Sequence, residues 1–254
     1  MSGSVVTAIE GNVGILTLNR PEKRNALTME MRSRLSTYLD EFEKDPKVRV
    51  VILQGAPPSF CAGVDLSELS TVATAQPVVT PSVSARFAAF SKPIFASVNG
   101  AAAGGGLEIA LACDFIIASE TAKFLLPEVR IGSLPGGGGT QRLVRAIPRA
   151  VAVRMLYTGD AMYAPSALSY GLVTEIVDSE NLDAHALALA TKIAANAPLS
   201  LAAVKECLRV ANNAPLSEGL DVERDLWFQL MSTADRAEGR AAFRDGRPPE
   251  FRGK

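Results

Sequence analysis

The sequence predicts an α/β fold over residues 1–196, followed by a helical region over residues 197–254. Segments rich in β-branched residues alternate with segments whose apolar residues recur at helical spacing. The chain of 254 residues is long enough to bury roughly three quarters of its unfolded surface in one large core. Its hydrophobic content of 48% and charged content of 21% are typical of a globular protein that needs no disulfide or metal to fold.

The first predicted elements are a hairpin, a helix and a buried strand. Two β-rich runs within residues 5–18 flank Gly11-Asn12, a pair that favours a tight turn. Apolar residues at helical spacing then run from Met31 to Phe42. Residues 48–55 form an apolar run that ends in glycine, which predicts a buried strand.

The middle of the chain predicts a loop, a strand and a helix in that order. Residues 57–69 predict a loop leading into a helix, and the aperiodic stretch from Ser70 to Ser84 predicts a surface loop. Residues 92–100 predict a strand, residues 104–114 a helix, and residues 115–128 two short strands. Strand-strand-helix units therefore recur along the chain, although no residue repeat of fixed period accompanies them.

The last part of the chain is predicted to be helical. After Thr140 the pattern is helical apart from a strand at Leu172–Val177. From Leu199 two amphipathic patterns predict a separate layer of helices, through which we expect the protein to self-assemble. Their apolar positions are Leu201, Val204, Leu208 and Ala211, followed by Leu216, Leu220, Leu226, Trp227, Leu230 and Met231.

Charge and composition exclude several classes of function. A net charge of −1 gives no bulk attraction to nucleic acid or to acidic membranes. The first residues show no basic segment followed by an apolar one, and no apolar run reaches the roughly 18 residues that span a bilayer. We therefore expect a cytoplasmic protein with no nucleic-acid or membrane partner. Cys61, Cys113 and Cys207 are odd in number and lack C-x-x-C spacing, so we expect reduced thiols.

The histidine count restricts the chemistry further. His185 is the only histidine, in a predicted helix at the solvent edge, so a His-rich metal site is impossible and a structural or exposed role is expected. The glycine motifs of nucleotide-binding loops and of serine hydrolases are absent. We expect neither a metal nor a redox cofactor, so catalysis must rest on carboxylates and backbone groups.

Three consecutive glycines, residues 104–106, precede a buried helical run whose first turn carries Glu108. Glycine in a helix costs about 1 kcal/mol relative to alanine, and an unpaired buried carboxylate costs more. Glycine at a helix start lets a ligand approach N–H groups that have no partner in the helix and lie at the positive end of its dipole. The glycines therefore predict a pocket for an anion or a carbonyl oxygen, with tight helix–strand packing as the alternative.

A second loop, Ala62-Gly63 before Asp65, offers further backbone donors. Two loops with exposed N–H groups that converge on one oxygen would form an oxyanion hole.

Five segments, in order, resemble the signatures of the enoyl-CoA hydratase/isomerase (crotonase) superfamily. They are NRPEKRNAL at 19–27, FCAGVDLSEL at 60–69, KPIFASVNGAAAGGGLEIALACDF at 92–115, AKFLLPEVRIGSLPGGGGTQRL at 122–143 and AFRDGRPPEF at 242–251. The resemblance implies a crotonase-like spiral of repeated β-β-α units with a C-terminal helical trimerisation region, assembled as a homotrimer or as a hexamer of two trimers. It also implies an acyl-CoA thioester substrate, whose carbonyl oxygen would be bound by the backbone N–H groups of Ala62 and Gly105.

The resemblance also implies the reaction, because Glu108 and Glu128 occupy both positions that carry glutamate in the hydratases of the family. In water addition to a trans-2-enoyl-CoA, as in fatty acid β-oxidation, Glu108 would deprotonate the water that attacks C3 and Glu128 would protonate C2. Two carboxylates near one apolar site do not both ionise easily, so one should hold a proton. For Glu108 alone, stabilisation of a helix N-terminus is the alternative interpretation.

Further substrate-binding positions follow from the resemblance, and they are Arg24, Ala26, Gly63, Val64, Asp65, Leu66 and Gly136. A flexible helix start is the alternative for Gly136, and a solvated surface position is the alternative for Arg24. Leu125 and Leu126 are expected to narrow the acyl end of the site, and the stretch from Ser70 to Ser84 to tighten on acyl-CoA. After Phe243 the family's commoner lysine is missing, so Arg244 or Arg247 would make any phosphate contact across subunits.

Two other functions remain open at this point. One is a Δ3,Δ2-enoyl-CoA isomerase or another acyl-CoA lyase that uses the same two glutamates. The other is a noncatalytic or RNA-binding protein of crotonase fold, which intact Glu108 and Glu128 and the lack of a basic tract disfavour.

Overall fold

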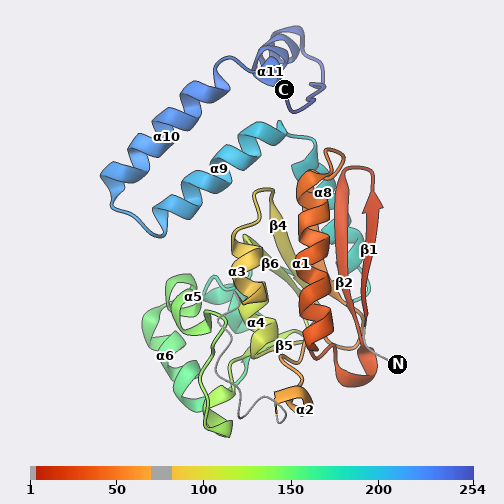
Figure 1. The fold of residues 1–254 in the computed structure, drawn as a ribbon, viewed down its shortest axis with the longest axis vertical. Coiled ribbons are helices and arrows are strands. Elements are labelled where there is room, and N and C mark those ends of the chain that lie inside the picture. Colours follow the sequence, from red (N-terminus) through yellow and green to blue (C-terminus); the bar gives the residue numbers. More distant parts are fainter. Residues whose placement is uncertain (1–3, 70–81) are drawn as a thin grey trace.

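The computed structural model describes residues 4–69 and 82–254, and it confirms the α/β fold (Figure 1). The main sheet has the strand order β1-β2-β3-β4-β6-β9. The predicted hairpin pairs β1 with β2 in antiparallel register, and each later neighbour is parallel, as strand-helix-strand connections require. The strands are β1 Ser4–Glu10, β2 Val13–Asn19, β3 Val50–Gly55, β4 Ile94–Val98, β6 Phe115–Ser119 and β9 Glu175–Val177.

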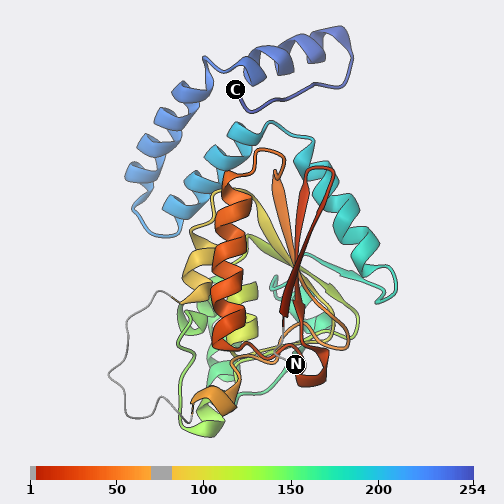
Figure 2. The ribbon, with the colours of Figure 1, turned by 45° about the vertical axis from the view of Figure 1, so that its right-hand side comes forward.

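Helices cover both faces of this sheet (Figure 2). On one face α1 (Met29–Lys44) buries four apolar residues spaced by three or four positions, and Thr28 caps it by accepting from the N–H of Met31. On the other face α8 (Leu182–Ala194) lies against the sheet through alanines four residues apart, which allow close approach. Because the inner strands are buried on both faces, they are almost continuously apolar.

A second, smaller sheet lies beside the main one. It has the order β5-β7-β8, with β5 at Ala101–Ala103, β7 at Lys123–Leu125 and β8 at Met162–Tyr163. The two strands predicted within residues 115–128 are confirmed as β6 and β7. The sequence did not predict β5 or β8, because runs of three and two residues carry no periodicity.

Short helices lie in the connections between the strands. Among them, α4 begins at Gly105, within the helix predicted for residues 104–114. These helices are η1 Pro21–Lys23, α2 Leu66–Leu69, α3 Val83–Ala88, α4 Gly105–Ala110, η2 Glu128–Ile131, α5 Gly139–Ala146, α6 Arg149–Thr158 and α7 Ala164–Ser169.

The C-terminal helices form a layer that extends away from the sheet (Figure 1). They are α9 Pro198–Ala211, α10 Leu216–Leu230 and α11 Ala234–Asp245, and they confirm the helices predicted for this region. Neither α9 nor α10 contains a buried residue in the single chain. Lys205 ties α9 to the core through a 3.0 Å ion pair with Asp114 and a 2.8 Å hydrogen bond to the carbonyl of Lys92.

Most of the loop predicted from Ser70 to Ser84 lies outside the described residues. Its last part differs from the prediction, because Ser82 caps α3 by accepting from the N–H of Ala85, and Ser84 is therefore helical. Within residues 4–69 and 82–254 no single helix is long and apolar enough to cross a membrane. Only α8 and α9 together pass that test of length and composition, and the chain bends by 102° between them.

Candidate active site

Three segments far apart in the sequence meet next to the N-terminus of α4. Leu27 bridges to Val64, and Cys61 bridges to Ala102 in the middle of β5. Gly104, which precedes α4, donates its N–H to the carbonyl of Leu125 at 2.9 Å. The structure therefore brings together the loops that the sequence analysis proposed as backbone donors.

Glu108 is buried in α4, with 5% of its surface exposed, although its neighbours in the helix are apolar. One carboxylate oxygen, Oε1, accepts hydrogen bonds from the N–H groups of Gly137 (2.6 Å) and Gly139 (2.8 Å). The other oxygen, Oε2, accepts none from the described residues. These contacts fix the carboxylate and leave one oxygen available to a ligand.

Glu128 opens η2, directly after Pro127. Its Oε1 faces Gly104, where an added Cβ would lie 3.1 Å from it. Its Oε2 is buried and has no hydrogen-bond partner among the described residues. Burial raises the pKa of Glu128, and repulsion from the nearby charge of Glu108 raises it further. Both causes favour the protonated form of Glu128 relative to a free glutamate.

Glycine is required at two positions of this site. Gly104 has a φ of +50°, and a side chain there would crowd Glu128. Gly63 has a φ of +99°, and an added Cβ would lie 2.9 Å from the carbonyl of Ala103 and 3.3 Å from the nitrogen of Gly105. The glycines therefore allow the loop around residue 63 to lie directly against the start of α4.

The expected backbone donor Ala62 is engaged elsewhere. Its N–H donates to the carbonyl of Arg24 at 2.9 Å, so Ala62 is not available as an oxyanion-hole donor in this structure. Within residues 4–69 and 82–254 the N–H of Val64 has no acceptor, and its nitrogen lies 3.6 Å from the position of a Cβ on Gly105. As the first residue of α4, Gly105 has no partner for its own N–H in the helix. The neighbouring donors are therefore Val64 and Gly105.

The other proposed substrate-binding residues lie on the two loops that contact each other here. Arg24 is exposed and has a φ of +50°, and the carbonyl of Ala26 accepts from Arg20 at 3.2 Å. Asp65 forms a 2.6 Å ion pair with the same Arg20. Hydrogen bonds from Ser67, together with Arg20, lower the pKa of Asp65 to about 2. Asp65 therefore holds the two loops together, while Leu66 is exposed.

Gly136 is exposed, and a Cβ on it would meet no atom of the described residues within 4 Å, so its role in substrate binding stays a prediction. The contacts to Glu108 come instead from Gly137 and Gly139 in the same run. Ser84 was missed by the sequence analysis. It is buried on α3, and its Oγ lies 3.0 Å from the position of a Cβ on Gly137. A small polar residue in an aperiodic stretch gives no sequence signal for such a position.

Leu126 is fully buried, and its Cδ1 lies 3.0 Å from the position of a Cβ on Gly139. It packs behind the loop that holds Glu108. Leu125 ends β7 and is partly buried.

Two of the three cysteines are buried, and the histidine is partly exposed. All three cysteines are free, and Cys61 and Cys113 are buried. Burial raises the pKa of the Cys61 thiol to about 12, which makes it unreactive. His185 is partly exposed on α8, where its Nε2 lies 2.5 Å from Glu175. Among the described residues no group of three or more His, Cys, Asp or Glu side chains is placed to hold a metal ion.

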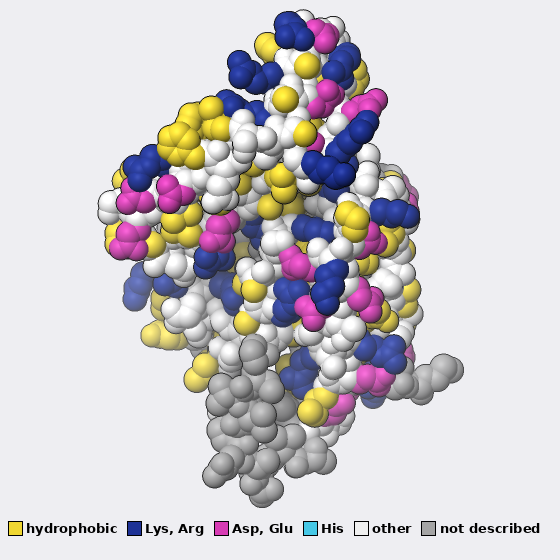
Figure 3. Space-filling view, turned by 45° about the horizontal axis from the view of Figure 1, so that its top comes forward, with side chains coloured by type: hydrophobic (Ala, Val, Ile, Leu, Met, Phe, Trp, Pro, Cys, Tyr) yellow, Lys and Arg dark blue, Asp and Glu magenta, His cyan; other side chains and the backbone are white. Residues whose placement is uncertain are grey.

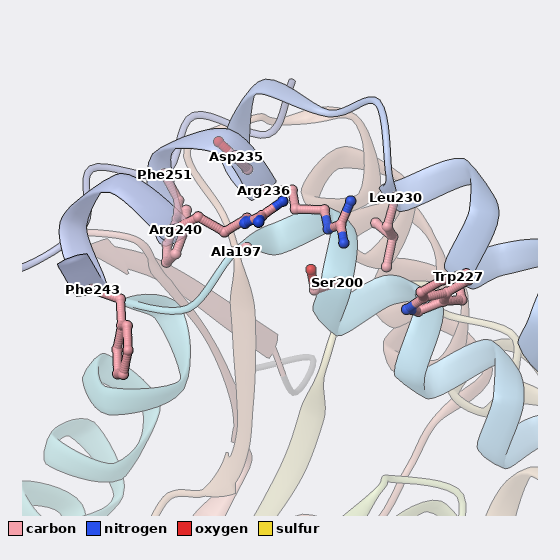
Figure 4. A pocket seen from close by; sticks show the side chains of 10 residues that line it. Ala197, Ser200, Trp227, Leu230, Asp235, Arg236, Arg240, Phe243 and Phe251 are labelled. Atoms are coloured by element: carbon pink, nitrogen blue, oxygen red, sulfur yellow. The ribbon is translucent and has the colours of Figure 1, made fainter.

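A cavity of about 450 Å³ lies far from these glutamates, between α9, α10, α11 and the C-terminal tail (Figure 4). Trp227, Leu230 and Phe251 contribute apolar surface to it, while Arg236 and Arg240 contribute charge. Apolar side chains also gather on the outer surface of this layer (Figure 3). Arg247 is held in an ion pair with Glu238 at 2.6 Å, and Arg244 pairs with Asp245 at 3.1 Å.

Known proteins resemble this chain over nearly its whole length. A family model described as enoyl-CoA hydratase/isomerase matches residues 8–254. The chain is 39% identical over 252 residues to 2,3-dehydroadipyl-CoA hydratase of Escherichia coli K12, covering 98% of this chain and 99% of that protein. It is 42% identical over 260 residues to (E)-benzylidenesuccinyl-CoA hydratase of Thauera aromatica, covering 98% and 99%.

Solved structures give the same result. An enoyl-CoA hydratase from Polaromonas sp. JS666 superposes with a TM-score of 0.92 at 35% identity, covering 98% of this chain and 100% of that one. An enoyl-CoA hydratase from Mycobacterium tuberculosis H37Rv gives a TM-score of 0.92 at 33% identity, covering 98% and 99%.

Proposed function

Because this chain belongs to the enoyl-CoA hydratase/isomerase family, we propose that it adds water across the double bond of a trans-2-enoyl-CoA to give a 3-hydroxyacyl-CoA. The chain has the crotonase fold, and its relatives indicate a hydro-lyase that acts on an acyl-CoA thioester. The observation that supports the specific reaction best is the pair of glutamates, of which Glu108 is buried and fixed by backbone donors, while partly buried Glu128 has a raised pKa.

The thioester carbonyl oxygen is proposed to lie between the N–H groups of Val64 and Gly105. Attack at C3 moves the electrons of the double bond onto this oxygen and forms an enolate. Two fixed donors and the positive end of α4 stabilise that developing charge, and one such donor is typically worth about 3 to 4 kcal/mol in the transition state. Both donors are backbone groups, so their positions depend on Gly63 and Gly104 rather than on side-chain chemistry.

The two glutamates are proposed to move the protons. Glu108 uses its free Oε2 to accept a proton from the water that forms the C3–O bond, while Oε1 stays bonded to Gly137 and Gly139. Glu128, whose burial favours the protonated form, delivers a proton to C2. The two carboxylates are proposed to share these tasks. Because only water and protons are transferred, the reaction calls for no metal or redox cofactor.

The test is turnover by the wild type, Glu108→Gln, Glu128→Gln and the double variant. Each single change keeps the side-chain shape and should lower hydration of crotonyl-CoA by about 10²- to 10⁴-fold. The rate loss of the double variant should be much smaller than the product of the two single losses, because removing either glutamate already stops the coupled proton transfer. Loss of the conjugated-enone absorbance reports the rate, and thermal melts exclude misfolding.

An isomerase would give a different result, because it would depend on Glu128 alone to move a proton. Isomerisation of a 3-enoyl-CoA by all four proteins separates the two reactions. Near-wild-type hydration by Glu108→Gln would end the hydratase mechanism. A panel that includes crotonyl-CoA and 2,3-dehydroadipyl-CoA then ranks the acyl chains that the site accepts.

We also propose that the protein works as a homotrimer, alone or paired as a hexamer, formed through its C-terminal helices. The support is the absence of buried residues in α9 and α10, although both are amphipathic. Exposed large apolar side chains on these two helices are Leu199, Val204, Leu208, Leu216, Leu220, Trp227 and Phe228.

A further inference from the structure

Glu108 and Glu128 are held in different ways. Two backbone N–H groups hold the Glu108 carboxylate directly. Among the described residues, the Glu128 carboxylate has a hydrogen bond only from its own backbone N–H, and its Oε2 is buried without a partner. Its position must therefore be set by the backbone of η2, a four-residue 3₁₀-helix with no side-chain cap. An isolated helical turn of this length is not stable by itself, so its position depends on what it packs against.

Arg130, two residues after Glu128, fastens η2 to the end of α6. Its Nε donates to the carbonyl of Thr158 at 2.9 Å, and its Nη2 lies 2.5 Å from Oδ1 of Asp160. The carbonyls at a helix C-terminus lack intrahelical partners and carry the negative end of the dipole. A guanidinium is well suited to this place, because its planar fork donates to a carbonyl and a carboxylate at once.

Gly159 lets the C-terminal end of α6 lie close to residues that precede and follow Glu128 in the chain. It is the left-handed C-cap of α6, with a φ of +67°. A Cβ on Gly159 would lie 2.9 Å from Nε of Arg130 and 3.1 Å from Cα of Pro127. Pro127 immediately precedes Glu128, so the end of α6 contacts the chain one residue before Glu128 and two residues after it.

From this arrangement we propose that Arg130 is a positioning residue for Glu128, acting by fixing η2 on the C-terminus of α6. The proposal rests on the proposed function of Glu128 as the proton donor to C2. Arg130 and Asp160 are 53% and 58% exposed, and an ion pair this exposed contributes little to the stability of the fold. The main effect of Arg130 is therefore on catalytic geometry, where a shift of about 1 Å costs roughly a hundredfold in rate.

The test compares Arg130→Met with Arg34→Met. Arg34 is a matched control, because it is 48% exposed and forms a 2.8 Å ion pair with Glu30 on α1. Arg130→Met should lower kcat for crotonyl-CoA hydration about ten- to hundredfold, with KM within about twofold and a melting temperature close to that of Arg34→Met. Asp160→Asn keeps the bond to Thr158 and should lose less activity than Arg130→Met.

A double-variant cycle shows whether Arg130 acts through Glu128. In the Glu128→Gln background Arg130→Met should cost less than about twofold, because there is no proton donor left to position. An equal loss in both backgrounds, or a kcat within twofold of Arg34→Met, overturns the positioning role. If Glu128→Gln keeps nearly the full rate of hydration, the proposed function of Glu128 is wrong. That result comes from Glu128→Gln alone, so it is distinct from a failure of the Arg130 proposal, which the Arg130→Met variants test.

Discussion

Gly137→Ala should lower the rate of crotonyl-CoA hydration about a hundredfold, a much larger loss than Gly136→Ala, one residue earlier, should cause. A Cβ on Gly137 would lie 2.6 Å from Oε2 of Glu108 and 2.9 Å from its carboxyl carbon. Ordinary van der Waals contact begins at 3.4 Å, so the methyl group overlaps the carboxylate by about 0.8 Å. Because the N–H of Gly137 also holds Oε1 of Glu108 at 2.6 Å, neither group can shift without disturbing that bond.

A displacement of this size predicts a loss of roughly a hundredfold in kcat for crotonyl-CoA hydration. Gly136 is the control, because a Cβ on it meets no described atom within 4 Å. Neither glycine has a positive φ, so alanine strains the backbone at neither position. The decrease in enone absorbance measures the rate, and thermal melts verify that both variants fold. The reasoning is refuted if Gly137→Ala stays within about threefold of Gly136→Ala.

Three further outcomes are expected. Glu128→Gln should raise the melting temperature near pH 8 but not near pH 4. Because the pKa of Glu128 is raised in the folded state, ionisation of this carboxylate destabilises the fold as pH rises through that pKa, and glutamine removes the penalty. A difference in melting temperature that does not change with pH would contradict this. Gly106→Ala should lower the free energy of unfolding by about 1 to 3 kcal/mol, since its Cβ would lie 2.5 Å from the carbonyl of Cys61; an unchanged urea midpoint would refute it. Trp227, the only tryptophan and 52% exposed in one chain, should become buried on assembly and show blue-shifted emission, whereas a sedimenting monomer at micromolar concentration would count against the trimer.

The order of elements was predictable because it depends on local pattern. The apolar positions of α1 repeat every three or four residues, and the buried strands are almost continuously apolar. Both kinds of element can therefore be predicted without knowing which segments they pack against. The short strands β5 and β8 were not readable. Their residues form strands only because β7 lies between them and supplies the hydrogen bonds.

The sequence by itself determined that Gly105 and Glu108 share a site, because both belong to one helix start and their spacing fixes their relation. Only the tertiary structure decided which N–H of the neighbouring loop joins them. Ala62 donates to Arg24, a partner 38 positions away, and the φ of +99° at Gly63 leaves Val64 as the free donor. No sequence pattern indicated that Arg130 holds η2 in place, because this depends on the C-terminus of α6 packing against η2. Local sequence fixes which groups a turn exposes, whereas the partner that each group meets depends on the packing of distant segments.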